Sequence, residues 1–371
     1  MKLILVLLLF TFVISANAQS GISLGVGVPN YVAKFSPDGS KVFTLNIGES
    51  AVYDLAGTQI SSHKSAIKRT IESDVGYSHC SGIMAIKQVT PGNATAVSLI
   101  DTNSGQATST FEILPLVAGE VRKIQFSADC SRLFVSGQGP DRTELITVKV
   151  FDVASKALVY SKDFRSSLYF MQESMSPDGT KILVNDYQNF AVFDISMGNE
   201  IYKFGPAGRL MWAEFAPDSQ SVISITDVYS QRIHRHFLAD GTIEFVAEIE
   251  SPVNPKFRFH PKDKDLIVLT GKYENSQIYF VNYKSLITKV FSLGLVGNID
   301  SYCFDSSATS MVIMPNEGNL SIMDMTSGQI TSTVPMQLGR TYSSCAVSPD
   351  GKKLAVTSNA GASIHDLGVS K

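Results

Sequence analysis

The sequence predicts an all-β protein in which one unit recurs about every 45 residues. One observation is a turn motif that begins near residues 35, 80, 126, 175, 215, 259, 304 and 347. A second is an acidic or amide residue that closes each unit, at Asp54, Asp101, Asp152, Asp194, Asp240, Asn282, Asp324 and Asp366. A third is that no window of helical length shows the apolar period of about 3.6 residues that an amphipathic helix requires.

The first segment of the 371-residue chain predicts export. Met1-Lys2 precedes an apolar run over residues 3–14, and the small residues that follow form a cleavage site after Ala18. These features are typical of a secretory signal peptide. A membrane anchor is the alternative, but the run is shorter than the ~20 residues that a spanning helix needs. We therefore expect residues 1–18 to be removed and residues 19–371 to be secreted, or periplasmic in a bacterium.

Composition narrows the possible partners. Hydrophobic residues make up 44% of the chain, which excludes intrinsic disorder. The 31 Lys and Arg residues against 34 Asp and Glu residues give a net charge of −3. This balance offers no basic surface for nucleic acid or anionic lipid. We expect a monomer without cofactor, nucleic-acid partner or membrane insertion.

The repeated unit has a physical explanation. The motif Ser36-Pro37-Asp38-Gly39 has turn chemistry, because Pro fixes φ and Gly relieves the strain that follows. The flanking segments, such as residues 41–45, alternate apolar and polar side chains as half-buried strands do. The same motif returns at residues 176–179 and 348–351, and weaker copies begin at Phe126, Phe215, Phe259 and Phe304. A degenerate copy near residues 77–80 fills the remaining gap.

This unit resembles the blade repeat of WD-repeat and YVTN-type β-propellers, over about residues 20–368. It departs from true WD repeats, because Trp212 is the one Trp and the Gly-His dipeptide is missing. The resemblance implies a single propeller of eight four-stranded blades, or seven if a degenerate copy is misread. The eighth unit has room for three strands, at residues 342–348, 353–358 and 362–367. We expect residues 21–28 to supply its fourth strand and close the ring.

The four cysteines of an exported chain predict disulfides. Of the three possible pairings, Cys80–Cys130 with Cys303–Cys345 joins neighbouring units in both cases, and buried thiols are the alternative. No Cys-x-x-Cys spacing indicates zinc. Two further motifs, Asn93-Ala94-Thr95 and Asn319-Leu320-Ser321, are glycosylation acceptors in a host that glycosylates exported proteins.

Two apparent sites have a simpler interpretation. His234-Arg235-His236 places two imidazoles on one face of a strand, but no third metal ligand is evident, so we expect solvent-facing histidines. The pattern Gly-x-Ser-x-Gly at residues 21–25 matches a nucleophile elbow, which needs an α/β context that this chain lacks.

Aromatic residues gather where the first strand of each unit begins. The resemblance places these positions around the mouth of a central channel, where they could stack on a sugar or anchor a peptide. Packing between blades is the competing explanation. We expect Trp212 and Tyr302 to be the most exposed members of the set, which comprises Tyr31, Tyr77, Tyr169, Phe170, Trp212, Tyr302 and Tyr342.

The predicted function is a non-enzymatic binding scaffold for an extracellular protein, peptide or glycan, held on the face around the channel. The alternative is a hydrolase, since YVTN-type propellers resemble the lactonase family. That activity needs convergent His, Arg and Glu side chains, and Arg122, Glu173 and Arg209 lie near strand starts. A haem-binding propeller would need axial ligands, which no motif here identifies.

Overall fold

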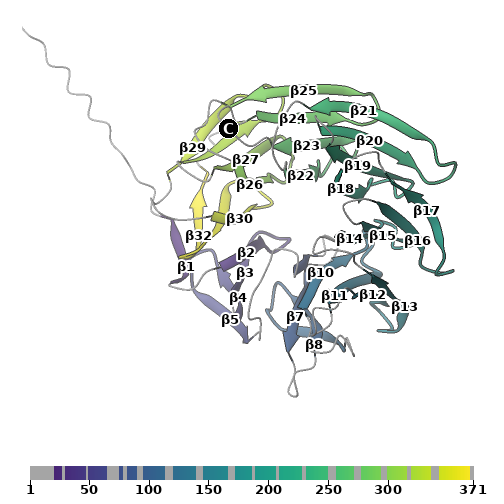
Figure 1. The fold of residues 1–371 in the computed structure, drawn as a ribbon. Coiled ribbons are helices and arrows are strands. Elements are labelled where there is room, and N and C mark those ends of the chain that lie inside the picture. The colour runs from purple at the N-terminus through teal and green to yellow at the C-terminus, as the bar shows by residue number, and fades with distance from the viewer. Residues whose placement is uncertain are drawn as a thin grey trace, which may run out of the picture.

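Eight antiparallel sheets of four strands each surround a central axis (Figure 1). In this computed structural model every regular element of the described residues is a strand. The all-β, eight-bladed prediction is confirmed. The described residues are 21–26, 30–46, 49–64, 75–77, 82–89, 95–112, 120–138, 145–165, 172–185, 189–205, 209–227, 231–249, 256–270, 277–293, 299–315, 319–335 and 342–367.

Blades 1 to 4 follow the chain in order. Blade 1 has strands β2 (Asn30–Phe35), β3 (Lys41–Asn46), β4 (Glu49–Asp54) and β5 (Gln59–Lys64). Blade 2 has β6 (Val75–Tyr77), β7 (Ile83–Val89), β8 (Thr95–Asp101) and β9 (Ala107–Glu112). Blade 3 has β10 (Glu120–Phe126), β11 (Arg132–Gln138), β12 (Leu145–Asp152) and β13 (Leu158–Arg165). Blade 4 has β14 (Gln172–Met175), β15 (Lys181–Asn185), β16 (Phe190–Asp194) and β17 (Glu200–Phe204).

Blades 5 to 8 complete the ring. Blade 5 has β18 (Arg209–Phe215), β19 (Ser221–Asp227), β20 (Gln231–Phe237) and β21 (Ile243–Ile249). Blade 6 has β22 (Lys256–Phe259), β23 (Leu266–Thr270), β24 (Gln277–Asn282) and β25 (Ile287–Ser292). Blade 7 has β26 (Ile299–Phe304), β27 (Ser310–Pro315), β28 (Leu320–Asp324) and β29 (Ile330–Val334). Blade 8 has β30 (Tyr342–Val347), β31 (Lys353–Ser358), β32 (Gly361–Asp366) and β1 (Ile22–Val26).

Strand β1 closes the ring, as the sequence predicts. It lies beside β32 (Figure 1). The two strands pair antiparallel, with Ile22 opposite Ile364 and Leu24 opposite Ala362. Leu24 is fully buried and packs with both partner-strand residues and with blade 1. The start of the folded chain therefore completes the sheet formed by its end. Residues 1–20 lie outside the described residues, so the signal peptide stays a prediction.

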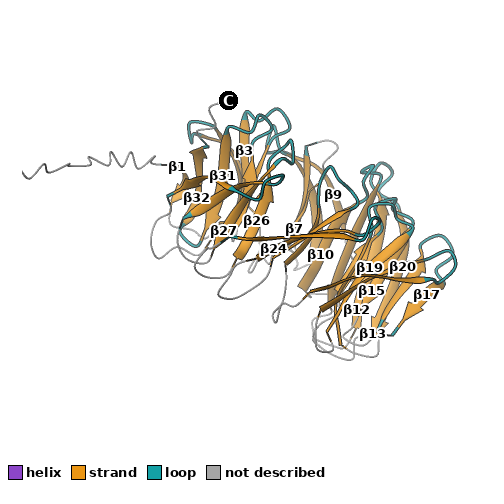
Figure 2. Ribbon diagram, turned by 90° about the horizontal axis from the view of Figure 1, so that it is seen from above, coloured by secondary structure: helices purple, strands orange, loops and turns teal. Residues whose placement is uncertain are grey.

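The two edges of each sheet carry different connections. In blade 1, Asn46 pairs with Asn30 and also with Glu49, so the start of the first strand and the connection between the second and third strands share one edge. We call this edge of the ring the entrance face. The Ser-Pro-Asp-Gly turns and the turns before the fourth strands lie at the other edge, the turn face. Most of the described turns accordingly lie on one side of the molecule (Figure 2).

The repeated turn motif forms a small hydrogen-bond network. The Ser36 hydroxyl donates to Asp38 Oδ1 at 2.6 Å, and the same oxygen accepts from the Ser40 N–H at 3.0 Å. The Lys41 N–H in turn donates to Ser36 Oγ at 3.0 Å. Gly39 has a φ of 72°, a conformation that favours glycine. Equivalent Ser–Asp bonds recur at Ser127–Asp129, Ser176–Asp178 and Ser348–Asp350.

Neighbouring turns are linked to one another across the turn face. The Ala128 N–H of blade 3 donates to Pro177 O of blade 4 at 2.7 Å. The Asp178 N–H donates to Ser219 Oγ of blade 5 at 3.0 Å. His260, which stands where other units have Ser, accepts the Asp263 N–H at Nδ1 and donates from Nε2 to Ala308 O of blade 7. The turns therefore hold the blades in register as well as ending the strands.

A disulfide joins the first strands of blades 7 and 8. Cys303 on β26 bonds to Cys345 on β30, with their Cα atoms 5.8 Å apart. This pair of the predicted set is confirmed. Cys130 occupies the glycine position of its turn with a φ of 63°, and Cys80 lies outside the described residues. The pairing of Cys80 with Cys130 stays a prediction.

Removal of residues 19–29 is expected to lower the melting temperature by several degrees, because it exposes the edge of β32 and the pocket that Leu24 fills. Leu24→Ala should reproduce much of the loss, whereas Ser23→Ala on the exposed side of the same strand should not. Thermal unfolding followed by circular dichroism measures both effects. An unchanged melt after truncation would show that the pairing of β1 contributes no stability.

Loss of the Cys303–Cys345 bridge is expected to lower the free energy of unfolding. A bridge between residues 42 apart contributes about 4 kcal/mol in the chain-entropy description. The Cys303→Ser/Cys345→Ser double variant, unfolded in urea beside the unreduced parent, tests this value. Titration of the unreduced parent should find no reactive thiol if Cys80 and Cys130 also pair, and two if they do not. Four reactive thiols would contradict the bridge.

The turn aspartates predict acid sensitivity. Hydrogen bonds from the Ser36 hydroxyl and the Ser40 N–H lower the pKa of Asp38 from 3.8 to about 2, and the pKa values of Asp129 and Asp350 are lowered in the same way. A depressed native pKa contributes stability that is complete above the unfolded value and is lost as the pH falls from about 4 to about 2. The free energy of unfolding should fall across that interval.

Replacing the hydroxyls that stabilise these carboxylates should reduce this fall. The triple variant Ser36→Ala/Ser127→Ala/Ser348→Ala is expected to have a shallower pH dependence than the parent, whereas Ser292→Ala, at an exposed position on an outer strand, should match the parent. Urea unfolding at a series of pH values compares the slopes. Equal slopes in the parent and the triple variant would refute the assignment.

Candidate functional site

Tyr302 is buried, so its expected exposure is wrong. The side chain is 1% exposed, and its hydroxyl donates to Val268 O of blade 6 at 2.9 Å. The Arg258 guanidinium lies 5.3 Å from the ring centroid and Phe304 packs against the ring edge. The phenol thus fills the space between blades 6 and 7 with its polar atom satisfied. Packing between blades explains this aromatic residue.

Trp212 is partly exposed and stacks on a neighbouring blade. Its ring centroid lies 3.6 Å from that of Phe257, with 36° between the planes. Trp212 is on β18 and Phe257 is on β22, so the pair joins the first strands of blades 5 and 6. Tyr31, Tyr77 and Tyr342 lie on the first strands of blades 1, 2 and 8, but their side chains are outside the described part of the structure, as are Tyr169 and Phe170.

Arg122 and Glu173 meet between blades 3 and 4. Arg122 Nε lies 3.2 Å from Glu173 Oε1, and the Ser136 hydroxyl donates to the same oxygen at 2.7 Å. The Glu173 side chain is 3% exposed, and its other oxygen, Oε2, is buried without a hydrogen-bond donor among the described residues. Because a buried carboxylate is costly unless its oxygens are bonded, Oε2 is ready to accept a hydrogen bond.

A second contact fixes the two strands that carry this pair. Gln125 Nε2 donates to Met175 O at 2.8 Å, and the Met175 N–H donates to Gln125 Oε1 at 3.0 Å. The amide of β10 thus pairs with the backbone of β14 as another strand would. This clip sets the position of Glu173 relative to Arg122. The sequence carries no local sign of the pair, because the two residues are 51 positions apart.

Three more charged side chains, Lys123, Glu214 and Arg258, lie on the first strands of blades 3, 5 and 6. Burial raises the pKa of Glu214 on β18, while the positive charges of Lys123 on β10 and Arg258 on β22 lower it. With Arg122 and Glu173, the charged residues of these first strands therefore come from blades 3 to 6.

Two contacting pairs, Arg122 with Glu173 and Trp212 with Phe257, lie on neighbouring first strands, and we call these four residues the axial arc. They lie on β10, β14, β18 and β22, the first strands of four consecutive blades, three to five residues before the turn that follows. They are therefore at similar depth along the axis. The arc contains a guanidinium paired with Glu173, a buried carboxylate oxygen without a donor among the described residues and two partly exposed aromatic rings, which together suit a polar ligand with a stacking face.

The hydrolase alternative needs an imidazole that the arc does not provide. The described histidine side chains are on the third strands of blades 5 and 8 and in a turn, and none is on a first strand in the described ranges. Arg209 begins β18, but its side chain is outside the described part. No group of three or more His, Cys, Asp or Glu side chains is placed to hold a metal ion among the described residues.

His236 is buried, so the expectation of two solvent-facing histidines is wrong. Its Nε2 lies 2.8 Å from Ser224 Oγ, and its Nδ1 lies 3.2 Å from the Tyr202 hydroxyl. Burial lowers the pKa of His236 to about 3, with a smaller contribution from the charge of His234, so the ring is neutral at physiological pH. Packing against Phe204, with centroids 4.3 Å apart, shows that this histidine is a core residue.

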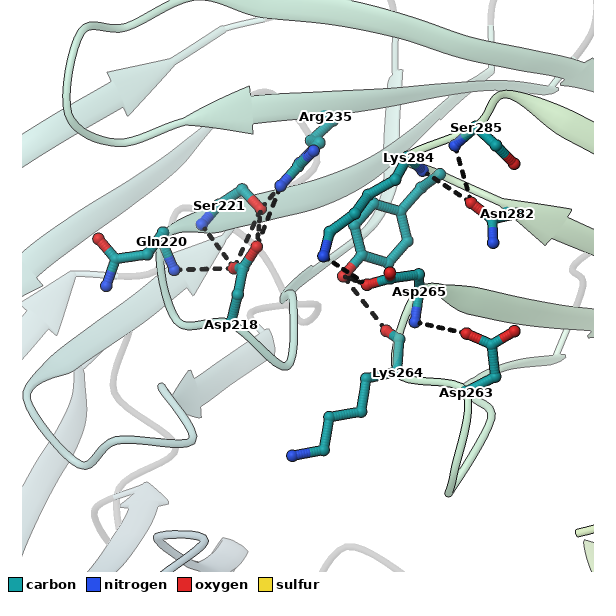
Figure 3. Close-up of polar contacts among 11 residues, drawn as sticks. Asp218, Gln220, Ser221, Arg235, Asp263, Lys264, Asp265, Asn282, Lys284 and Ser285 are labelled. Carbon is teal, nitrogen blue, oxygen red and sulfur yellow. Dashed lines mark hydrogen bonds and ion pairs between the residues drawn. The ribbon is translucent and has the colours of Figure 1, made fainter.

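A polar cluster between blades 5 and 6 has a structural role (Figure 3). Arg235 bonds to Asp218 at 3.0 Å and to Ser221 Oγ at 3.1 Å, and its guanidinium lies 5.1 Å from the ring centroid of Tyr283. The Tyr283 hydroxyl donates to Lys264 O at 3.2 Å. Each named group has a partner inside the cluster, which joins two blades at the turn face, so we assign it no ligand.

The glycosylation acceptors remain predictions. Asn319 is exposed directly before β28, and Asn93 lies outside the described residues.

Within the described part of the chain, the structure has no helix with the length and apolar character needed to span a membrane.

Comparisons with known proteins bear on the fold alone. No family model matches the sequence, and no curated protein matches it. Among solved structures, the C-terminal WD40 domain of Sif2 matches with a TM-score of 0.67 at 12% identity, over 94% of this chain and 98% of that chain. Kuenenia stuttgartiensis hydrazine synthase matches with a TM-score of 0.54 at 16% identity, over 95% and 99%. The chain has the fold of a WD40-like β-propeller.

Proposed function

We propose that the protein is an exported, non-enzymatic binding scaffold that holds an extracellular protein, peptide or glycan at the axial arc. The observation that carries the proposal is the buried Oε2 atom of Glu173, which lacks a donor among the described residues while Arg122 and Ser136 hold the other oxygen. A ligand hydroxyl or amide that inserts between β10 and β14 would complete this set. Export rests on the N-terminal segment, and the Cys303–Cys345 bridge agrees with it.

The aromatic half of the arc supplies contact area. Trp212 and Phe257 are held by their mutual stack, so a ligand that covers them immobilises few additional rotamers. Both strands are fixed within four-stranded sheets, which makes the site preorganised. A peptide group or a sugar ring has the required combination of hydrogen-bond donors and an apolar face.

Peptide and glycan arrays probed with the purified chain test this function. A ligand identified there should bind at least tenfold more weakly to Trp212→Ala and to Arg122→Gln, because each variant removes a contact of the size typical of an interface hot spot. Met197→Ala, at a position that is 69% exposed on the turn face of blade 4, is the matched control. Circular dichroism confirms that each variant is folded.

Two results would contradict the proposal. One is equal binding by the parent, Trp212→Ala and Arg122→Gln. The other is loss of binding after changes at the turn face while the variants of the axial arc bind normally. Either result would show that the ligand does not bind at the first strands of blades 3 to 6.

A further inference from the structure

A hollow lies between blades 3 and 4, away from the axial arc. It has a volume of about 150 Å³ and is formed where β13, β15 and β16 meet the entrance face, with β17 at its side. Pockets for drug-sized ligands are typically about 300–1,000 Å³. The hollow is therefore the size of one amino-acid side chain with its backbone groups.

The base of the hollow is apolar and rigid. Phe164 of blade 3 and Phe193 of blade 4 pack with ring centroids 5.0 Å apart, and Val184 contributes beside them. All three belong to one buried cluster that fills the space between the blades. Water in contact with such a surface has few hydrogen-bond partners, so an apolar group that displaces it is stabilised.

The rim carries two cations from two different blades. Arg165 ends β13 and Lys203 lies on β17, both are exposed, and neither forms an ion pair within the part of the chain that the structure describes. No Asp or Glu lines the hollow. Lys162 lies 4.2 Å from the centroid of the Phe193 ring and adds positive charge beneath the base. The rim therefore favours an anion.

An amide is available between the base and the rim. Asn185 is 4% exposed, and its Oδ1 accepts the Gln172 N–H at 3.0 Å, which fixes the orientation of the side chain. Its Nδ2 donates to Gln172 Oε1 at 3.4 Å, a long contact that uses one of the two amide hydrogens. The other hydrogen can donate to a carbonyl oxygen in the hollow.

We propose that this hollow binds the C-terminal residue of a partner polypeptide. The terminal side chain, of Leu or Val size, packs on Phe164 and Phe193, the α-carboxylate pairs with Arg165 and Lys203, and the preceding peptide carbonyl accepts from Asn185. A chain end combines a carboxylate with a separate apolar side chain on one residue. An internal Asp or Glu does not, because its carboxylate forms the tip of the side chain and would face the apolar base.

Fluorescence anisotropy with a dye-labelled peptide of sequence Gly-Ser-Gly-Ser-Ala-Leu tests the proposal. The peptide with a free carboxylate should bind the purified chain, and the amidated peptide should bind at least tenfold more weakly. The double variant Arg165→Gln/Lys203→Gln should lose at least tenfold in affinity and most of the dependence on salt. Ala191→Leu, which adds volume at the lining, should weaken binding without changing the charge.

Two controls separate this site from other causes. Lys289→Gln, at an exposed position on the outer strand of blade 6, removes one charge elsewhere and should bind as the parent does. Trp212→Ala should also bind normally, because the axial arc is a different site. The inference therefore stands or falls independently of the proposed function.

Several outcomes would overturn the inference. These are an absence of measurable binding, equal affinity for the free and amidated peptides, and full affinity in the Arg165→Gln/Lys203→Gln variant. N-acetyl-leucine competing as well as the unlabelled peptide would assign the hollow to small carboxylic acids and would likewise exclude recognition of a chain end.

Discussion

Contacts between the first strands of neighbouring blades determine what the rest of the structure can do. A single four-stranded sheet cannot bury both of its faces, and core clusters here combine residues of adjacent blades. Around the axis the contacts differ in chemistry: an amide clip at Gln125 and Met175, a phenol bond from Tyr302 to Val268 and a disulfide at Cys303 and Cys345. Any site on the first strands inherits the rigidity of these links.

A large side chain that packs between blades is not available to contact a ligand. Exposure is predicted for Tyr302 and His236 from the sequence, but both side chains fill spaces inside or between blades, with their polar atoms hydrogen-bonded. Trp212 and Phe257 also stack on each other, but they keep part of their surface exposed. An aromatic residue at the start of a first strand thus packs against its neighbours, and only the structure shows how much of its surface stays exposed.

Most of the fold could be predicted from the sequence because its strongest signals are local. The Ser36–Asp38 bond and its copies need a fixed short spacing, so the turn motif recurs in the sequence at regular intervals. The last unit has sequence for three strands only, and this predicted that residues 21–28 supply the fourth. The site could not be predicted in this way. Arg122 and Glu173 meet only because β10 and β14 pack side by side, and the hollow depends on how two sheets diverge at one edge.

A recurrent irregularity explains how such sites arise without weakening the ring. The register of β10 skips Arg122, which leaves this residue outside the ladder, and its side chain reaches Glu173 on β14. The register skips one residue at the equivalent place in four other first strands, at Tyr31, Met211, Asp300 and Ser343. Because the strand pairs on both sides of each skip remain intact, these positions can change in charge and size while the ladder is preserved. Under the proposed function, variation at the bulges can therefore alter binding near the axis while the strand pairing is kept.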